Sequence, residues 1–169
     1  MTRPIFYTDK LNNWDKITMT TYFVILCGIW FCYDKSLPIA TQKNILLWLG
    51  LGTQILLYAI NYKSLRNLKV YFFWVLISIL HLYLFFYFKS DPKLIGVGGH
   101  YATILRNTFP LLILFQVLRF ISAKTQGLEL VSLSKGSTTD IFDERRITFI
   151  DFILFIIYFA TTFILATVD

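Results

Sequence analysis

Residues 101–121 read YATILRNTFPLLILFQVLRFI, and an aspartate, Asp151, lies within the next apolar run. This stretch decides the fold because its uninterrupted apolar part, 109–118, is too short to cross a bilayer, which takes about 20 helical residues. A crossing here must therefore carry Arg106 and Arg119 inside the helix. A charge near the membrane centre costs roughly 2.5–3.5 kcal/mol on insertion scales, so we expect all three charged residues to face a partner or a polar path.

The composition is that of an integral membrane protein. Of the 169 residues, 56% are hydrophobic and only 15% are charged, and the mean hydropathy is +0.61; a soluble domain averages about 25% charged residues. The apolar runs are continuous and do not alternate with polar residues, which favours helices over a membrane β-barrel. The sequence predicts an all-α fold in which residues 1–169 form a single transmembrane helical domain.

We predict five transmembrane helices, with four as the alternative if 101–121 does not cross. The expected spans cover about residues 17–33, 45–62, 70–88, 101–121 and 147–168, and they leave a loop of about 25 residues, 122–146. With five spans, eleven of the 16 lysines and arginines fall on the side of the N-terminus and five on the other. The positive-inside rule then places the N-terminus and this loop in the cytoplasm and the C-terminus outside, in a plasma membrane or a bacterial inner membrane.

Several classes of function are disfavoured by the sequence. The net charge of +6 comes from basic residues that flank apolar runs, so we expect no binding to nucleic acid. Motifs of nucleotide binding, metalloproteases and serine hydrolases are missing, and His81 has no acidic or histidine neighbour three or four residues away. We therefore expect no catalytic residue, no cofactor and no metal. An enzyme with dispersed active-site residues remains the alternative.

Two further polar residues, His81 and Gln54, are candidates for a role inside the membrane, and Arg106 is a candidate for a role at its edge. His81 and Gln54 lie at comparable depths on neighbouring antiparallel spans, so we expect them to meet. An interhelical hydrogen bond worth about 1 kcal/mol is favoured over a proton or quinone site. We expect Arg106 to contact an outer-leaflet phosphate, the C-terminal carboxylate or a partner protein. Lys89, Lys93 and His100 would complete a basic rim around it.

The strongest pairing expected from the sequence is between Arg119 and Asp151. Both lie about one turn inside the membrane on the cytoplasmic side, where a guanidinium and a carboxylate form a bidentate pair. In the alternative, Arg119 extends to lipid headgroups and Asp151 joins Arg145, Arg146 or a capping network.

Two functions fit this pattern. The first is a non-enzymatic membrane subunit or scaffold that contacts lipids, other integral membrane proteins and a cytoplasmic partner at loop 122–146. The second is a small transporter, channel or lipid-handling protein in which Arg106, Arg119, Asp151, His81 and Gln54 line a polar path. We favour the first, because five spans barely enclose a path.

Overall fold

The computed structural model describes residues 6–33, 36–96, 98–133, 139–142 and 145–167. Within these residues the chain is mostly helical. The long helices are α1 (Asn13–Cys32), α2 (Ile39–Ile55), α3 (Leu68–Lys89), α5 (Thr108–Gln126) and α6 (Phe149–Thr167). The shorter helical elements are η1 (Leu56–Ile60), η2 (Ser64–Arg66), η3 (Pro92–Leu94) and α4 (Thr103–Arg106). A two-stranded antiparallel hairpin joins β1 (Ile95–Gly96) to β2 (Gly99–His100), with Ile95 opposite His100.

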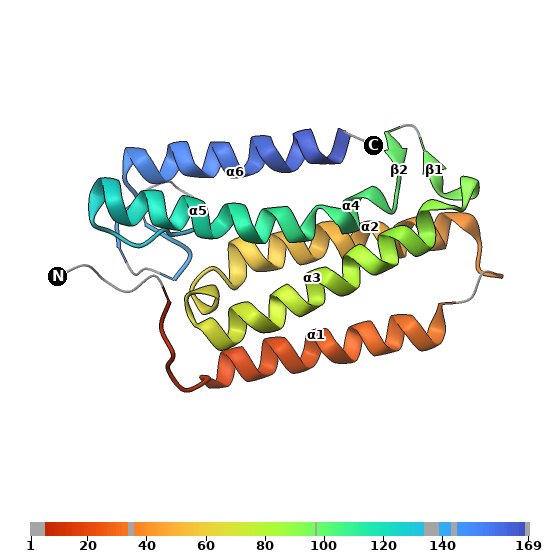
Figure 1. Ribbon diagram of the computed structural model, residues 1–169, viewed down its shortest axis with the longest axis horizontal. Coiled ribbons are helices and arrows are strands. Elements are labelled where there is room, and N and C mark those ends of the chain that lie inside the picture. Colours follow the sequence, from red (N-terminus) through yellow and green to blue (C-terminus); the bar gives the residue numbers. More distant parts are fainter. Residues whose placement is uncertain (1–5, 34–35, 97, 134–138, 143–144, 168–169) are drawn as a thin grey trace.

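The five long helices lie side by side along the long axis of the molecule, as Figure 1 shows. Helices α1 and α6 form opposite edges, and α2, α3 and α5 lie between them. Helices α1, α3 and α6 begin at the same end as α5 finishes, whereas the β1–β2 hairpin lies at the other end. Residues before α1 and residues after α5 therefore meet at one end of the bundle.

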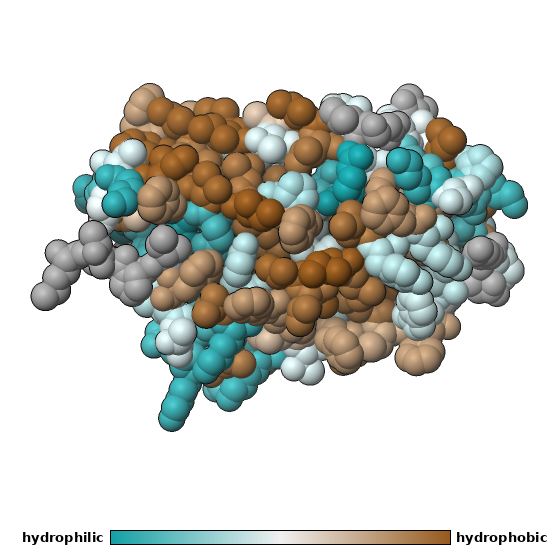
Figure 2. All heavy atoms as spheres, in the orientation of Figure 1, coloured by the Kyte–Doolittle hydropathy of each residue, from teal (hydrophilic) through white to brown (hydrophobic). Residues whose placement is uncertain are grey.

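Four helical segments are long and apolar enough to cross a membrane. They are Ile39–Ile60, Leu68–Lys89, Thr103–Gln126 and Phe149–Thr167. Hydrophobic side chains cover the middle of the molecule in Figure 2, and hydrophilic side chains gather toward both ends. These four segments confirm the prediction of a helical membrane protein.

The helix bounds differ from the predicted spans at two important places. Helix α2 begins at Ile39, directly after Pro38, because proline fits the start of a helix, where its missing N–H has no intrahelical partner. Helix α5 continues to Gln126 and ends at Gly127, whose φ of 66° is the left-handed conformation that terminates many helices. The loop after α5 therefore begins at Gly127, later than the sequence suggested.

The helix that carries Arg106 is broken at Asn107, between α4 and α5. Pro110 cannot donate a backbone hydrogen bond to the Arg106 carbonyl, so the helical ladder is interrupted there. Gln54 of α2 donates through Nε2 to the Ile104 carbonyl at 3.0 Å. The buried side chain of Gln54 thus ties α2 to the helix beside the break.

Helix α4 approaches α2 closely at Gly50. A Cβ atom at Gly50 would lie 2.6 Å from Cγ2 and 3.1 Å from the backbone carbonyl carbon of Ile104, whereas a Cβ at Gly52 would meet only Trp48 at 4.0 Å. Gly50 is therefore a point of close approach between α2 and α4, and Gly52 has ordinary space around it.

These two glycines give a matched test of helix packing. We expect Gly50→Ala to lower the free energy of unfolding by about 1–3 kcal/mol, because overpacking a dense interior displaces backbone. Gly52→Ala is the control and should be neutral or stabilising by up to about 1 kcal/mol through helix propensity. Unfolding monitored by circular dichroism in detergent measures both, and equal stability of the two variants would contradict the close contact.

Candidate functional site

A buried ion pair between Arg119 and Glu129 joins α5 to the segment that follows it. The Arg119 side chain is only 3% exposed, and its Nε and Nη2 atoms lie 2.6 and 3.0 Å from the two carboxylate oxygens of Glu129. This two-point contact is the geometry that a planar guanidinium makes with a carboxylate. Because Gly127 turns the chain back at the end of α5, the carboxylate meets an arginine more than two turns earlier in the sequence.

Two other segments of the chain meet the same carboxylate. Tyr7 donates its hydroxyl to Glu129 at 3.1 Å, and the Nε of Arg66 lies 3.8 Å from Oε2. Arg66 also donates to the Leu130 carbonyl at 3.1 Å. Backbone bonds from Tyr7 to Arg66 and from Leu68 to Tyr7 fix the N-terminal segment against the start of α3. Glu129 therefore contacts residues from before α1, from before α3 and from within α5.

The charge of Glu129 is stabilised by its partners. Burial alone raises the pKa of this carboxyl, but the hydrogen bonds and positive charge of Arg119, with the charge of Arg66 and the bond from Tyr7, outweigh burial. The pKa of Glu129 is consequently lower than its usual value of 4.5. The site thus holds a carboxylate, and no proton, across the neutral range.

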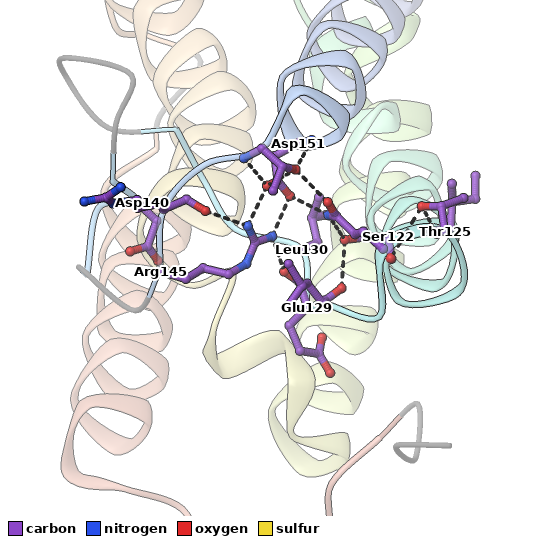
Figure 3. Close-up of polar contacts among 12 residues, drawn as sticks. Ser122, Thr125, Glu129, Leu130, Asp140, Arg145 and Asp151 are labelled. Atoms are coloured by element: carbon purple, nitrogen blue, oxygen red, sulfur yellow. Dashed lines mark hydrogen bonds and ion pairs between the residues drawn. The ribbon is translucent and has the colours of Figure 1, made fainter. Parts of the chain in front are cut away.

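A second ion pair lies beside the first at the start of α6 (Figure 3). Arg145 contacts both carboxylate oxygens of Asp151 at 2.7 Å, and Asp151 is fully buried. Thr148 donates its backbone N–H and its hydroxyl to the same carboxylate, and Gln126 donates to it at 3.0 Å. Arg145 also donates to the Glu129 carbonyl at 2.7 Å, which connects the two ion pairs.

The predicted pairing of Arg119 with Asp151 is wrong. Arg119 binds Glu129, and Asp151 binds Arg145 together with a capping network at Thr148. The alternative expectation for Asp151 is therefore confirmed, whereas Arg119 does not extend to the membrane surface but is buried. The physical reason is that the polar segment after α5 folds back onto the helix ends and supplies each buried charge with a nearer counter-ion.

A hydrogen-bonded chain crosses the middle of the bundle from α1 to α5. The Tyr22 hydroxyl lies 2.5 Å from Oγ1 of Thr53 and 2.9 Å from Nε2 of His81, and Nδ1 of His81 lies 3.0 Å from Oγ1 of Thr108. Thr53 donates its own proton to the Leu49 carbonyl, so Tyr22 donates to Thr53. An imidazole protonated at Nε2 then satisfies every member of the chain without a charge.

His81 and Gln54 do not bond to one another, contrary to the pairing expected from their depth. Both are buried, but His81 bonds Tyr22 and Thr108, whereas Gln54 bonds the Ile104 carbonyl. The interhelical hydrogen bond expected between His81 and Gln54 is therefore wrong, and each of the two side chains bonds across helices to other residues. The sequence analysis did not identify Tyr22 as a partner of His81, because tyrosines are typical of the membrane border and give no sign of a buried hydrogen bond.

Arg106 lies at the opposite end of the bundle from the two ion pairs. It is half-buried, and its guanidinium carbon is 5.5 Å from the centre of the Phe85 ring. Lys89 stands over the same ring at 5.2 Å, so this part of the predicted basic rim comes together. His100 instead donates through Nε2 to the Asp91 carbonyl at 3.0 Å and closes the hairpin.

Besides Tyr22, sequence reasoning also overlooked Glu129 and Arg66. The available signal was charge balance, since Glu129 is the only carboxylate between Asp91 and Asp140 in a stretch that holds two buried arginine candidates. In the described ranges, no three His, Cys, Asp or Glu side chains gather in a group that would hold a metal ion. Comparisons with protein-family profiles, curated proteins and solved structures found no match to this chain.

A double-mutant cycle tests the assignment of the pairs. Glu129→Leu should lower the free energy of unfolding by roughly 3–5 kcal/mol, because it leaves the buried Arg119 without its carboxylate. Arg119→Leu should cost less, because Arg66 and Tyr7 still contact Glu129. The double variant should lose much less than the sum of the two. Arg119→Leu combined with Asp151→Leu should be close to additive, and a coupling there as large as that of Arg119 with Glu129 would restore the discarded pairing.

Acidification provides a second check. Because the folded-state pKa of Glu129 is below 4.5, its contribution to stability is complete above that value and is lost as the pH falls through the folded pKa. We expect the thermal midpoint in detergent to fall with pH in that range, and Glu129→Gln to flatten the dependence. An unchanged pH profile in Glu129→Gln would contradict the role of this carboxylate.

Proposed function

We propose that the protein is a non-enzymatic membrane subunit or scaffold that presents residues 127–133, 139–142 and 145–148 as a docking platform for a partner. The observation that carries the proposal is that hydrogen bonds hold these residues against the helix ends. Glu129, Arg145 and Thr148 all bond to buried side chains of the bundle or to each other's backbone. A backbone held in this way loses little conformational entropy when a partner binds.

The same segment carries apolar side chains that face outward. Leu128, Ile141 and Phe142 are 37%, 41% and 44% exposed. Tyr62 donates a hydrogen bond to Asp140, and the centre of its ring lies 5.6 Å from the centre of the Phe142 ring. These contacts with the buried Tyr62 hold the exposed residues 141–142 in place. Apolar side chains on an ordered polar surface are typical of protein interaction sites. The exposed apolar residues therefore favour binding of a partner outside the membrane over a role for this segment as a simple connection between helices.

We further propose that the chain crosses a plasma membrane or a bacterial inner membrane five times. The docking platform and the N-terminus would then lie on the cytoplasmic side. Helix α1 supports the fifth crossing, because its 20 residues span about 30 Å and it runs along the long axis of the molecule with the other long helices, beginning beside the start of α3, in Figure 1. Its first turn is polar, with Asp15 and Lys16, and suits the membrane border. The excess of lysine and arginine at this end supports the orientation.

Large apolar side chains on the outer helix faces support contact with other membrane proteins. Phe31, Phe149 and Phe163 are 84%, 77% and 68% exposed. Such side chains suit lipid, and they also suit a neighbouring transmembrane helix, where van der Waals packing drives association.

The second candidate, a lipid-handling protein, is favoured by one groove. A groove of ≈ 520 Å³ between α1 and α2 is lined mostly by apolar residues, together with the polar side chains of Tyr22, Thr41, Asn44 and Thr53. However, the polar residues expected to line one path divide into separate groups. Gln54 and His81 lie in the middle of the bundle, Arg119 and Asp151 at one end, and Arg106 at the other. The hydrogen bonds and ion pairs within these groups favour the scaffold.

The docking proposal is tested by comparing partner binding by matched surface variants. The full chain purified in gentle detergent should carry a stoichiometric partner, and Ile141→Ser or Leu128→Ser should weaken that complex about tenfold or more, because each removes apolar area from the interface. The control is Ile95→Ser, which changes an even more exposed apolar residue in the hairpin at the other end. A lone monomer that carries bound lipid would contradict the scaffold and favour the second candidate.

A further inference from the structure

The groove between α1 and α2 is long and lies within the membrane-spanning part of α2. Its lining residues run from Thr41 to Leu56 on the α2 side and from Tyr22 to Ile29 on the α1 side. Helix α1 ends and α2 begins at the end of the bundle that carries the β1–β2 hairpin (Figure 1). The groove therefore extends from near that end of the apolar segment Ile39–Ile60 past its middle.

Two hydrogen bonds join α1 to α2 near the two ends of this groove. In the middle of the bundle the Tyr22 hydroxyl lies 2.5 Å from Oγ1 of Thr53. Near the hairpin end Tyr33 donates its hydroxyl to Oε1 of Gln42 at 2.8 Å. Thr53 and Gln42 are both buried. These two bonds fix the spacing of the helices, so the groove between them is a permanent feature of the fold.

Gly52 leaves the inner part of the groove open. An added Cβ atom at this position would meet only the Trp48 ring, at 4.0 Å. Trp48 also lines the groove and is 68% exposed. A larger side chain at position 52 would therefore enter the groove without displacing any backbone.

The dimensions of the groove fit a single hydrocarbon chain. At about 1.5 Å per residue, the stretch from Thr41 to Leu56 rises about 22 Å. This is the depth of one leaflet, since a bilayer with its headgroups is about 40–45 Å thick. Spread over that length, ≈ 520 Å³ gives a cross-section of roughly 25 Å². A helix 10–12 Å in diameter needs about 80–110 Å². The groove is thus too narrow for a helix of a partner protein.

Asn44 places a polar group at the outer part of the groove. Its side chain is exposed and hydrogen-bonds no residue in the described part of the chain. It lies about 8 Å into the apolar segment that begins at Ile39. A polar group that faces lipid is costly unless it finds a hydrogen-bond partner. The ester carbonyls of a glycerolipid, at the junction of headgroup and acyl chains, are acceptors for its amide N–H.

We propose that this groove binds one acyl chain of a glycerophospholipid, with the Asn44 amide donating a hydrogen bond to the ester carbonyl of that chain. The acyl chain extends past Gly52 toward the bond between Tyr22 and Thr53, and the headgroup stays outside the groove at the hairpin end. The inference goes beyond the docking platform, because it concerns the other end of the bundle and needs no partner protein.

Lipid retention by the purified full-length chain tests the proposal. Delipidated protein is given an equimolar mixture of dioleoyl phosphatidylcholine and its diether analogue, which lacks the ester carbonyls, and retained lipid is counted by native mass spectrometry. We expect a preference of about fivefold for the diester, the effect of one neutral hydrogen bond. Asn44→Leu should abolish this preference. Gly52→Leu should weaken retention of both lipids about tenfold or more, because it fills the space of several buried methylene groups.

The matched control is Gly28→Leu, which adds the same side chain to α1 at a position outside the groove, where a Cβ meets no atom within 4 Å. It should change neither quantity. Equal retention of diester and diether by the wild type would overturn the proposal, as would equal retention by Gly52→Leu and Gly28→Leu at unchanged helical content.

Two further outcomes would reassign the groove. Tight binding of free oleate without retention of phospholipid would overturn the assignment to a glycerophospholipid. Loss of a co-purifying protein from Gly52→Leu, with lipid retention unchanged, would make the groove a protein interface. The ratio of the two lipids decides this site, whereas the presence of a partner protein decides the docking platform, so the two proposals fail separately.

Discussion

The buried contact between Arg119 and Glu129 is the interaction on which one whole end of the protein depends. A guanidinium that is 3% exposed in an apolar helix requires a counter-ion, and the chain provides it by turning back at Gly127. Once Glu129 is fixed there, Tyr7 and Arg66 bind to it as well. The N-terminal segment, the start of α3 and the segment after α5 are thereby joined at one point.

The second ion pair extends this arrangement to α6. Arg145 binds Asp151 and also the backbone of Glu129, so the beginning of the last helix is tied to the end of α5 through the polar segment between them. The middle of the bundle is stabilised differently, by uncharged hydrogen bonds among Tyr22, His81 and Thr108. Charges are thus concentrated near the helix ends, where water and headgroups lower their cost.

The sequence predicted the membrane class, the approximate helix positions and the burial of Arg119 and Asp151, because these follow from local hydropathy and the cost of a charge in lipid. It did not predict which charges pair. Arg119 and Asp151 were expected at the same depth, but their pairing depends on where Glu129 and Arg145 lie. Tertiary contacts decide those positions, and no periodic pattern in the sequence reveals them. Likewise, depth alone suggested His81 with Gln54, whereas helix rotation brings His81 to Tyr22 and Gln54 to Ile104.

The central claim is that residues before α1 and after α5 share the cytoplasmic side of a five-span bundle. It is tested most directly by labelling single cysteines with a membrane-impermeant reagent after Cys27 and Cys32 are replaced by serine. Cysteines introduced at Lys10 and Lys124 should both react only from the cytoplasmic side, and one at Ile95 only from the opposite side. Reaction of the Lys124 and Ile95 positions from the same side would show that the helix between them does not cross and would contradict the account.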